Sequence, residues 1–394
     1  MGQEPARVDW RGLLLDAGQG LEDRWDELRR AAWAELGWLG PITILPYRGY
    51  GDAGRLWLRG RVLESKGLEK PQAGAGAWDN LVRMLHRFET DEVPRARVRA
   101  AFGGRRAEVT ADDEGYFEVA FDALGCLEPD PSSGRRWREI GLELLEPSRP
   151  GQPGPVRASA RVLTPPASAR LGVISDVDDT IIKTGAYDLV RNWRTILLRS
   201  AEGRIPFRGV AAFYRALERG TGGGEPVNPI FYVSSSPWNL YDLLERFMEV
   251  HGIPVGPMSL RDFGLDRTKL VAGSHRDHKI GAIERLFAFY PGLSFVLVGD
   301  SGQHDAAIYA EVVRRHPRRV LAVYIRDVTP GEEVDREVRA LLEEVRRAGS
   351  RATFCPDLLE AAADAAAQGW ITAAAVDEVR REVAAETAAA AADG

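Results

Sequence analysis

Three aspartates occur within four positions, directly after an apolar run, in the stretch LGVISDVDDTIIKTG (171–185). Such a run is typical of a buried strand. Asp176 and Asp178 then point to the same side if the extended backbone continues past Ser175. Two carboxylates this close repel each other unless a cation lies between them or one stays protonated. The stretch therefore predicts either a metal site or an acid–base pair.

Two further apolar runs end in polar residues. The stretch IFYVSSSPW brings three hydroxyl groups to a strand end, those of Ser234, Ser235 and Ser236, and a helix is expected from Asn239. Hydroxyl groups and the amides at a helix N-terminus bind oxyanions. The stretch SFVLVGDSGQHDAAIY places Asp300 and Asp305 on the turn after a third strand.

A lysine completes this set of residues. Lys279, expected at the start of the helix HKIGAIERLFAFY, can supply a fixed positive charge, and His275 and His278 are expected beside it on a loop. Ligands of parallel α/β sheets bind outside the carboxyl ends of the strands, where all these groups would meet. Carboxylates with a divalent cation, hydroxyl groups and a lysine suit a phosphoryl group, whose transfer depends on positioning and charge neutralisation.

The elements that must position these residues are strands that alternate with helices. Beyond about residue 165, the apolar strands LGVIS, IFYVS, SFVLVGD and VLAVYI alternate with helices that begin near Gly209, Asn239, Lys279 and Asp305. This alternation predicts an α/β fold with a doubly wound parallel sheet of the Rossmann type.

The first half of the chain has a different sequence pattern. Short β-rich runs separated by Gly, Pro and Asp predict a mainly antiparallel, sandwich-like domain: PITILPY, RLWLRGRVL, ARVRAAFGG, RAEVTADDEGYFEVAF and WREIGLELLE. The fourth run is expected to form a hairpin around residues 113–115. One helix is expected near 79–88. The predicted division is an N-terminal helical segment (1–40), the sandwich-like domain (41–165), the catalytic domain (166–350) and an Ala-rich helical tail (351–394).

Composition narrows the class of protein. The net charge of −6 provides no overall basic field for nucleic acid or anionic membranes. The two cysteines, Cys126 and Cys355, form neither a disulfide framework nor a metal pair, which suits a reducing compartment. No stretch approaches the roughly 18 apolar residues of a spanning helix, so we expect a cytoplasmic protein that contacts membranes at most peripherally.

The motifs ISDVDDT, YVSSSPWNLY and GDSGQHD, together with Lys279, resemble those of the haloacid dehalogenase superfamily of phosphatases. The closer likeness is to the actin-patch phosphatidate phosphatase family, and it covers about residues 171–327. The resemblance implies that Asp176 is the nucleophile, which forms an aspartyl-phosphate. It implies that Asp178 protonates the leaving oxygen and then activates water.

The resemblance also implies how the other residues act. Mg²⁺ would be held by Asp176, the main-chain carbonyl of Asp178 and Asp300. Asp305 would either contact a metal-bound water or anchor Lys279. The phosphoryl oxygens would be bound by Lys279 and a serine, and Thr180 would orient the nucleophile loop. Ser234 is chosen over Ser235 because it comes immediately after the apolar run.

The expected function is hydrolysis of a phosphomonoester by a Mg²⁺-dependent phosphatase, with a phosphatidate-like lipid phosphate giving diacylglycerol. One alternative is a soluble, protein or nucleic-acid phosphomonoester as substrate. Another is a scaffolding protein whose sandwich recruits a partner. The amphipathic segment 186–200 would either pack on its own domain or lie at a lipid interface.

Overall fold

The structure is a computed structural model of the chain. It describes residues 40–64, 92–122, 136–149, 152, 154–177, 209–222, 226–261, 273–302, 304–329 and 331–392. The predicted N-terminal helical segment, the helix near 79–88 and the segment 186–200 lie outside these ranges. So do two of the predicted site residues, Asp178 and Thr180.

A six-stranded parallel sheet forms the centre of the second half of the chain. Its strands are β9 (Gly172–Asp176), β10 (Ile230–Pro237), β11 (Met258–Arg261), β12 (Phe295–Asp300), β13 (Val320–Arg326) and β14 (Arg351–Cys355). They lie in the order β11-β10-β9-β12-β13-β14, and every neighbouring pair is parallel. The strand order therefore reverses between β9 and β12, which is where sheets of this kind bind ligands.

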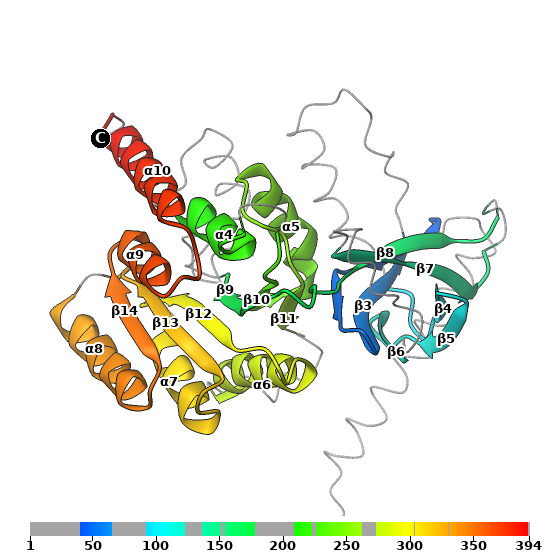
Figure 1. The fold of residues 1–394 in the computed structure, drawn as a ribbon. Helices are drawn as coiled ribbons and strands as arrows, with labels where there is room; N and C mark the ends of the chain where they lie inside the picture. The colour runs from blue at the N-terminus through cyan, green and yellow to red at the C-terminus, as the bar shows by residue number, and fades with distance from the viewer. Residues whose placement is uncertain are drawn as a thin grey trace, which may run out of the picture.

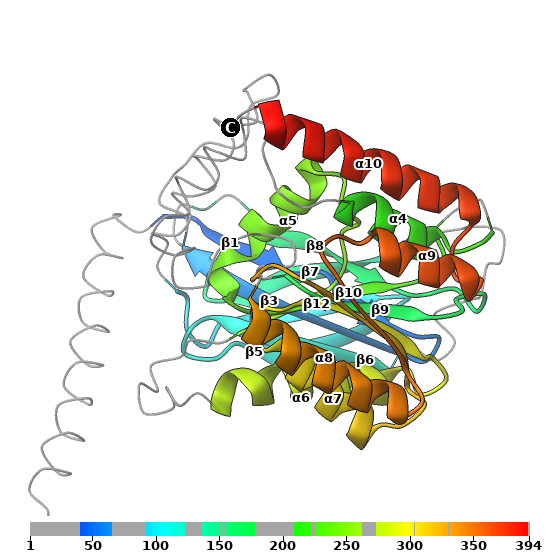
Figure 2. The ribbon, with the colours of Figure 1, turned by 90° about the vertical axis from the view of Figure 1, so that its left-hand side faces the viewer.

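Helices cover both faces of this sheet (Figures 1 and 2). One face packs against α4 (Val210–Arg219), α5 (Tyr241–Val250), α9 (Leu359–Ala367) and α10 (Ala373–Ala392). The other face packs against α6 (Gly273–Phe289), α7 (Asp305–Arg315) and α8 (Glu332–Arg347). Val173 lies in the first core and Ile174 in the second, so β9 is buried on both sides. This explains why its sequence is apolar throughout. The predicted α/β class with a parallel sheet is confirmed.

Two details of the prediction need correction. Helix α6 begins at Gly273, so Lys279 lies in its second turn, and His275 and His278 are on the same helix instead of a loop. The polar run GSHRDH has no apolar periodicity, and it therefore gave no helical signal. Strand β14, assigned from sequence to the tail, pairs with β13 and is part of the sheet.

The last helix is joined to α4 through its glutamates. Helix α4 has no side-chain cap of its own. Glu386 accepts a hydrogen bond from the Gly209 amide at 2.9 Å, and Glu382 accepts one from the Ala212 amide at 2.9 Å. Glu382 also pairs with Arg215 at 3.0 Å. Because carboxylates stabilise helix N-termini, α10 supplies the cap that α4 lacks.

The first half of the chain folds into one eight-stranded, mainly antiparallel sheet. Its strands are β1 (Ile42–Pro46), β2 (Gly49–Gly51), β3 (Arg55–Glu64), β4 (Arg97–Phe102), β5 (Arg105–Thr110), β6 (Tyr116–Asp122), β7 (Trp137–Glu146) and β8 (Arg157–Leu163). The hydrogen-bonded path is β1-β3-β2-β8-β7-β4-β5, with β6 on β3. Strand β5 contacts β6, and side chains from both parts of this sheet form one core. A sandwich of two separate sheets is not confirmed.

The predicted hairpin at 113–115 is wrong. The turn exists, but the strands on either side of it pair elsewhere, β5 with β4 and β6 with β3. The hairpin in this region is instead formed by β4 and β5, through Gly103 and Gly104, whose φ angles are 54° and 80°. Positive φ at both central residues is what a tight hairpin turn requires. The turn residues predicted where the chain turns, but they did not predict which strands pair.

A substitution at Asn228 tests how the parallel-sheet domain packs against the segment directly before β9. Its buried amide donates to the Leu217 carbonyl at 2.7 Å and accepts from the amides of Arg170 and Leu171 at 3.0 and 3.4 Å. Asn228→Ala leaves these backbone groups without that partner, so we expect a loss of about 2–4 kcal/mol in the free energy of unfolding. Thermal and urea unfolding would measure it.

Gln152→Ala is the matched control. Its side chain bonds to both backbone groups of Ile42 at 3.0 and 2.9 Å, but only half-buried, where water can replace it. If the two variants lost the same free energy of unfolding, the burial of Asn228 would not be what makes its hydrogen bonds important.

Candidate active site

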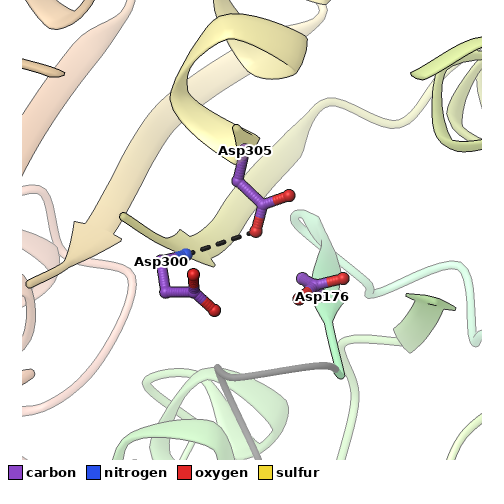
Figure 3. A group of neighbouring side chains, drawn as sticks. All are labelled: Asp176, Asp300 and Asp305. Carbon is purple, nitrogen blue, oxygen red and sulfur yellow. Dashed lines mark hydrogen bonds between the residues drawn. The ribbon is translucent and has the colours of Figure 1, made fainter. Parts of the chain in front are cut away.

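Three carboxylates meet at the carboxyl ends of the central strands. Asp176 ends β9, Asp300 ends β12, and Asp305 is the first residue of α7 (Figure 3). One oxygen from each lies within 4.8 Å of the other two. All three side chains are buried, with at most 1% of their surface exposed. The structure therefore brings together residues that are far apart in sequence at the edge that the strand order predicts.

Lys279 compensates part of their charge. Its Nζ atom lies 2.7 Å from Asp176 Oδ1 and 2.8 Å from Asp305 Oδ1. The lysine is itself 2% exposed, and α6 presents it from the opposite side of the sheet to α4. Of the two roles left open for Asp305, contact with Lys279 is the one observed. A buried cation between two carboxylates fixes their relative position.

Backbone amides hold two further carboxylate oxygens. The Asp300 amide donates to Asp305 Oδ2 at 3.3 Å (Figure 3). The Gly302 amide donates to Asp300 Oδ1 at 2.6 Å. This close approach requires a glycine before Asp300. A Cβ atom at Gly299 would lie 2.5 Å from Asp305 Oδ2 and 2.8 Å from Asp305 Cβ. The glycine of the GD motif is therefore explained by sterics.

The three serines of β10 follow directly after the same edge. The β9–β10 register ends with Asp176 opposite Val233, so Ser234 is the next residue on β10. Ser234, Ser235 and Ser236 are all buried. The Ser236 amide donates to Ser234 Oγ at 2.9 Å. The hydroxyl of Ser234 thus helps to shape its own turn, and the choice of Ser234 over Ser235 as a phosphate ligand stays a prediction.

The residues suit a hard divalent metal. Three carboxylates supply only oxygen ligands, which Mg²⁺ and Ca²⁺ prefer. Their mutual repulsion falls when a cation binds among them. Lys279 contacts two of the three, and each of the three offers one carboxylate oxygen as a possible ligand. Within the described ranges this is the one cluster of potential metal ligands.

The sequence analysis did not single out several residues near the site. Ser175 Oγ donates to the Asp176 carbonyl at 2.6 Å and lies 2.7 Å from the hydroxyl of Tyr214 on α4. Burial raises the pKa of Tyr214, and the hydrogen bond with Ser175 offsets part of that rise. Tyr309 donates to the Val298 carbonyl at 3.0 Å. Its pKa is raised by burial and then by the charges of the neighbouring aspartates. Both phenols therefore stay protonated and act as fixed hydrogen-bonding groups.

Arg326 is the other residue that sequence reasoning missed. It ends β13, lies opposite Asp300 in the strand register and is buried. The signal was available, because Arg326 follows an apolar run in the same way as Asp176 and Asp300 do. It places a second cation at the edge that carries the carboxylates.

Comparison with known proteins finds a family that matches this part of the chain. Residues 171–327 match the model of the family described as "Phosphatidate phosphatase APP1, catalytic domain". This part of the chain is therefore similar to the catalytic domain of that family. The matched segment begins just before β9 and ends just after β13, so it contains every described site residue named above.

Two curated relatives match part of the chain. Phosphatidate phosphatase APP1 of Saccharomyces cerevisiae is 31% identical over 182 residues, which are 44% of this chain and 30% of that protein. Uncharacterized protein C29B5.04c of Schizosaccharomyces pombe is 29% identical over 163 residues, 40% of this chain and 25% of that protein. The chain thus matches less than a third of the length of either relative.

A carbohydrate acetylesterase from Xanthomonas citri aligns with 78% of this chain and 66% of its own, at 13% identity and a TM-score of 0.24, which is too low to compare folds. In the part of the chain that the structure describes, no helix has the length and apolar character needed to cross a membrane.

Gly299 gives a direct test of the site's packing. Gly299→Ala forces Asp305 or the β12 backbone to move, and we expect a loss of about 1–3 kcal/mol in the free energy of unfolding, the usual cost of overpacking. Unfolding experiments would measure it. Gly292→Ala is the control, because a Cβ atom there meets no atom within 4 Å. A tolerated Gly299→Ala would mean that the close contact with Asp305 is not required.

Proposed function

We propose that the protein is a Mg²⁺-dependent phosphatase of the haloacid dehalogenase type, which hydrolyses a lipid phosphomonoester similar to phosphatidate. The observation that carries this proposal is the buried group of Asp176, Asp300, Asp305 and Lys279 inside a domain similar to the catalytic domain of the phosphatidate phosphatase family. The proposed enzyme is cytoplasmic and meets its substrate at a membrane surface.

In the proposed first step, an oxygen of Asp176 attacks phosphorus and the bond to the ester oxygen breaks. Asp178 gives its proton to the departing alkoxide, which leaves as the alcohol, diacylglycerol for a phosphatidate. The ammonium group of Lys279, 2.7 Å from Asp176, holds the nucleophile in place and offsets negative charge on the phosphoryl group. The product of this step is an aspartyl-phosphate on Asp176.

In the proposed second step, Asp178 removes a proton from water, which attacks the same phosphorus. The bond between phosphorus and Asp176 breaks, and inorganic phosphate leaves. A serine of β10 binds the phosphoryl oxygens from the neighbouring strand, and Thr180 orients the nucleophile loop. A Mg²⁺ ion held by Asp176, the Asp178 carbonyl and Asp300 would neutralise phosphate charge, with Asp305 as anchor of Lys279.

Metal removal is the first test. With phosphatidate in detergent micelles, chelation with excess EDTA should abolish phosphate release by the full chain, and added Mg²⁺ should restore it, because three buried carboxylates otherwise repel an anionic substrate. A small soluble phosphate ester and a phosphopeptide are assayed in parallel. Full activity in EDTA would refute the metal dependence, and a preference for a soluble ester would refute the lipid substrate.

The nucleophile is tested by Asp176→Asn. The amide cannot form the acyl-phosphate, so we expect turnover to fall by about 1,000-fold or more. Asp377→Asn, at an exposed position on α10, is the matched control and should keep wild-type turnover. Phosphate release is measured on proteins whose melting temperatures have been compared. Substantial turnover by Asp176→Asn would assign the nucleophile to another residue.

A further inference from the structure

The segment 234–239, here called the serine turn, begins where the regular strand ladder of β10 is interrupted. The pairing of β10 with β9 ends at Val233. The pairing of β10 with β11 jumps from Val233 to Pro237. The residues proposed to bind phosphate therefore have no continuous ladder on either side among the described residues. Contacts made by the residues immediately after them therefore contribute to their position.

The N-terminal sheet holds one side of this turn through Trp238. The ring of Tyr47 stacks on the indole of Trp238, with the centroids 4.6 Å apart. The guanidinium of Arg59, on β3, lies 4.8 Å from the centroid of the same indole. Tyr47 and Trp238 are both buried. Trp238 is thus enclosed by two side chains from the N-terminal sheet, and stacking of this kind fixes a ring in one orientation.

Arg61 holds the next residue. Its NH1 group donates to Asn239 Oδ1 at 2.8 Å. Its Nε donates to the Glu114 carbonyl at 2.9 Å, and its NH2 donates to Glu92 at 3.0 Å. Two sides of the guanidinium are therefore fixed by the N-terminal sheet itself, and the third is directed to the serine turn. Arg61 is 8% exposed, so water replaces these bonds poorly.

The start of α5 is fixed from the same sheet. The Arg48 amide donates to the hydroxyl of Tyr241 at 2.9 Å, and the Arg48 side chain pairs with Glu245 at 2.6 Å. The rings of Tyr47 and Tyr241 are 4.5 Å apart. Contacts from one sheet thus hold three successive parts of the segment that follows the serines.

We infer that the N-terminal sheet is a positioning element of the candidate active site, and that Arg61 is the residue through which it sets the serine turn. The sheet then contributes to phosphate binding without touching substrate. This inference rests on the proposed function, because it assigns the serine turn to the binding of phosphoryl oxygens. It also gives the N-terminal sheet a role that requires no separate partner.

The test compares two arginines of β3. Arg61→Met removes the bond to Asn239. Arg55→Met removes a different contact between the N-terminal sheet and the second half of the chain. Arg55 donates to the Phe289 carbonyl at 2.7 Å and lies over the Phe289 ring, at the end of α6. In the full chain, Arg61→Met should raise KM and the inhibition constant for inorganic phosphate about tenfold, as expected for one hydrogen bond to a charged group. Arg55→Met should leave both unchanged.

Amide hydrogen exchange provides a second readout that needs no turnover. Amides of residues 234–241 should exchange faster in Arg61→Met than in the wild type and in Arg55→Met. In a double-mutant cycle, Asn239→Ala should change the exchange less when added to Arg61→Met than when made alone, since both variants remove the bond between Arg61 and Asn239. Asn239→Ala also removes the longer bond from the Tyr116 hydroxyl, at 3.4 Å.

The outcomes separate the two proposals. Absence of phosphate release by the wild type from any ester would refute the proposed function, and the exchange data would then decide the positioning role alone. Unchanged exchange at 234–241 in Arg61→Met would overturn that role. Equal kinetic shifts in Arg61→Met and Arg55→Met would also overturn it, because they would reflect general loosening of the contact between the sheets.

Discussion

The repulsion between three buried carboxylates is the constraint that organises this part of the molecule. Asp176, Asp300 and Asp305 come from two strand ends and one helix start, and they are held together by Lys279 and by backbone amides. Such an arrangement is costly unless every oxygen has a defined role. The parallel sheet delivers the carboxylates to one edge, and the helix on one face delivers the compensating cation. Fold and chemistry are therefore specified by the same residues.

The N-terminal sheet meets the second half of the chain through arginines and aromatic rings, in addition to apolar side chains such as Leu45 and Leu163. Arg48, Arg59 and Arg61 direct their guanidinium groups to rings, carboxylates and amides, as their planar fork geometry allows. An interface of this kind fixes orientation more strictly than aliphatic contacts do, because each hydrogen bond has a preferred direction. That property is useful where one side of the contact lies immediately after a candidate phosphate-binding segment.

The sequence predicted most of the described site, because its residues follow apolar runs that only a buried strand explains. Asp176, Ser234 and Asp300 were placed at one edge for this reason. Lys279 was expected near them at the start of a helix, and it lies beside Asp176 in the second turn of a helix that begins earlier. Tyr214 could not be found in this way, since it occupies an ordinary position of an amphipathic helix and gains its role only from the neighbouring Ser175. In the N-terminal sheet, strands were visible from alternation, but their partners depend on long-range pairing. The misassigned hairpin at 113–115 shows that limit.

The glutamates of α10 that cap α4 have a consequence for how the chain is made. Helix α4 carries Tyr214, which bonds to the residue before Asp176, yet the amides at its start are satisfied by Glu382 and Glu386, more than 160 positions later. Domains are synthesised from the N-terminus onward. During translation the strand with Asp176 therefore leaves the ribosome long before the helix that completes its surroundings. The parallel domain can reach its final packing only once residues 373–392 have emerged.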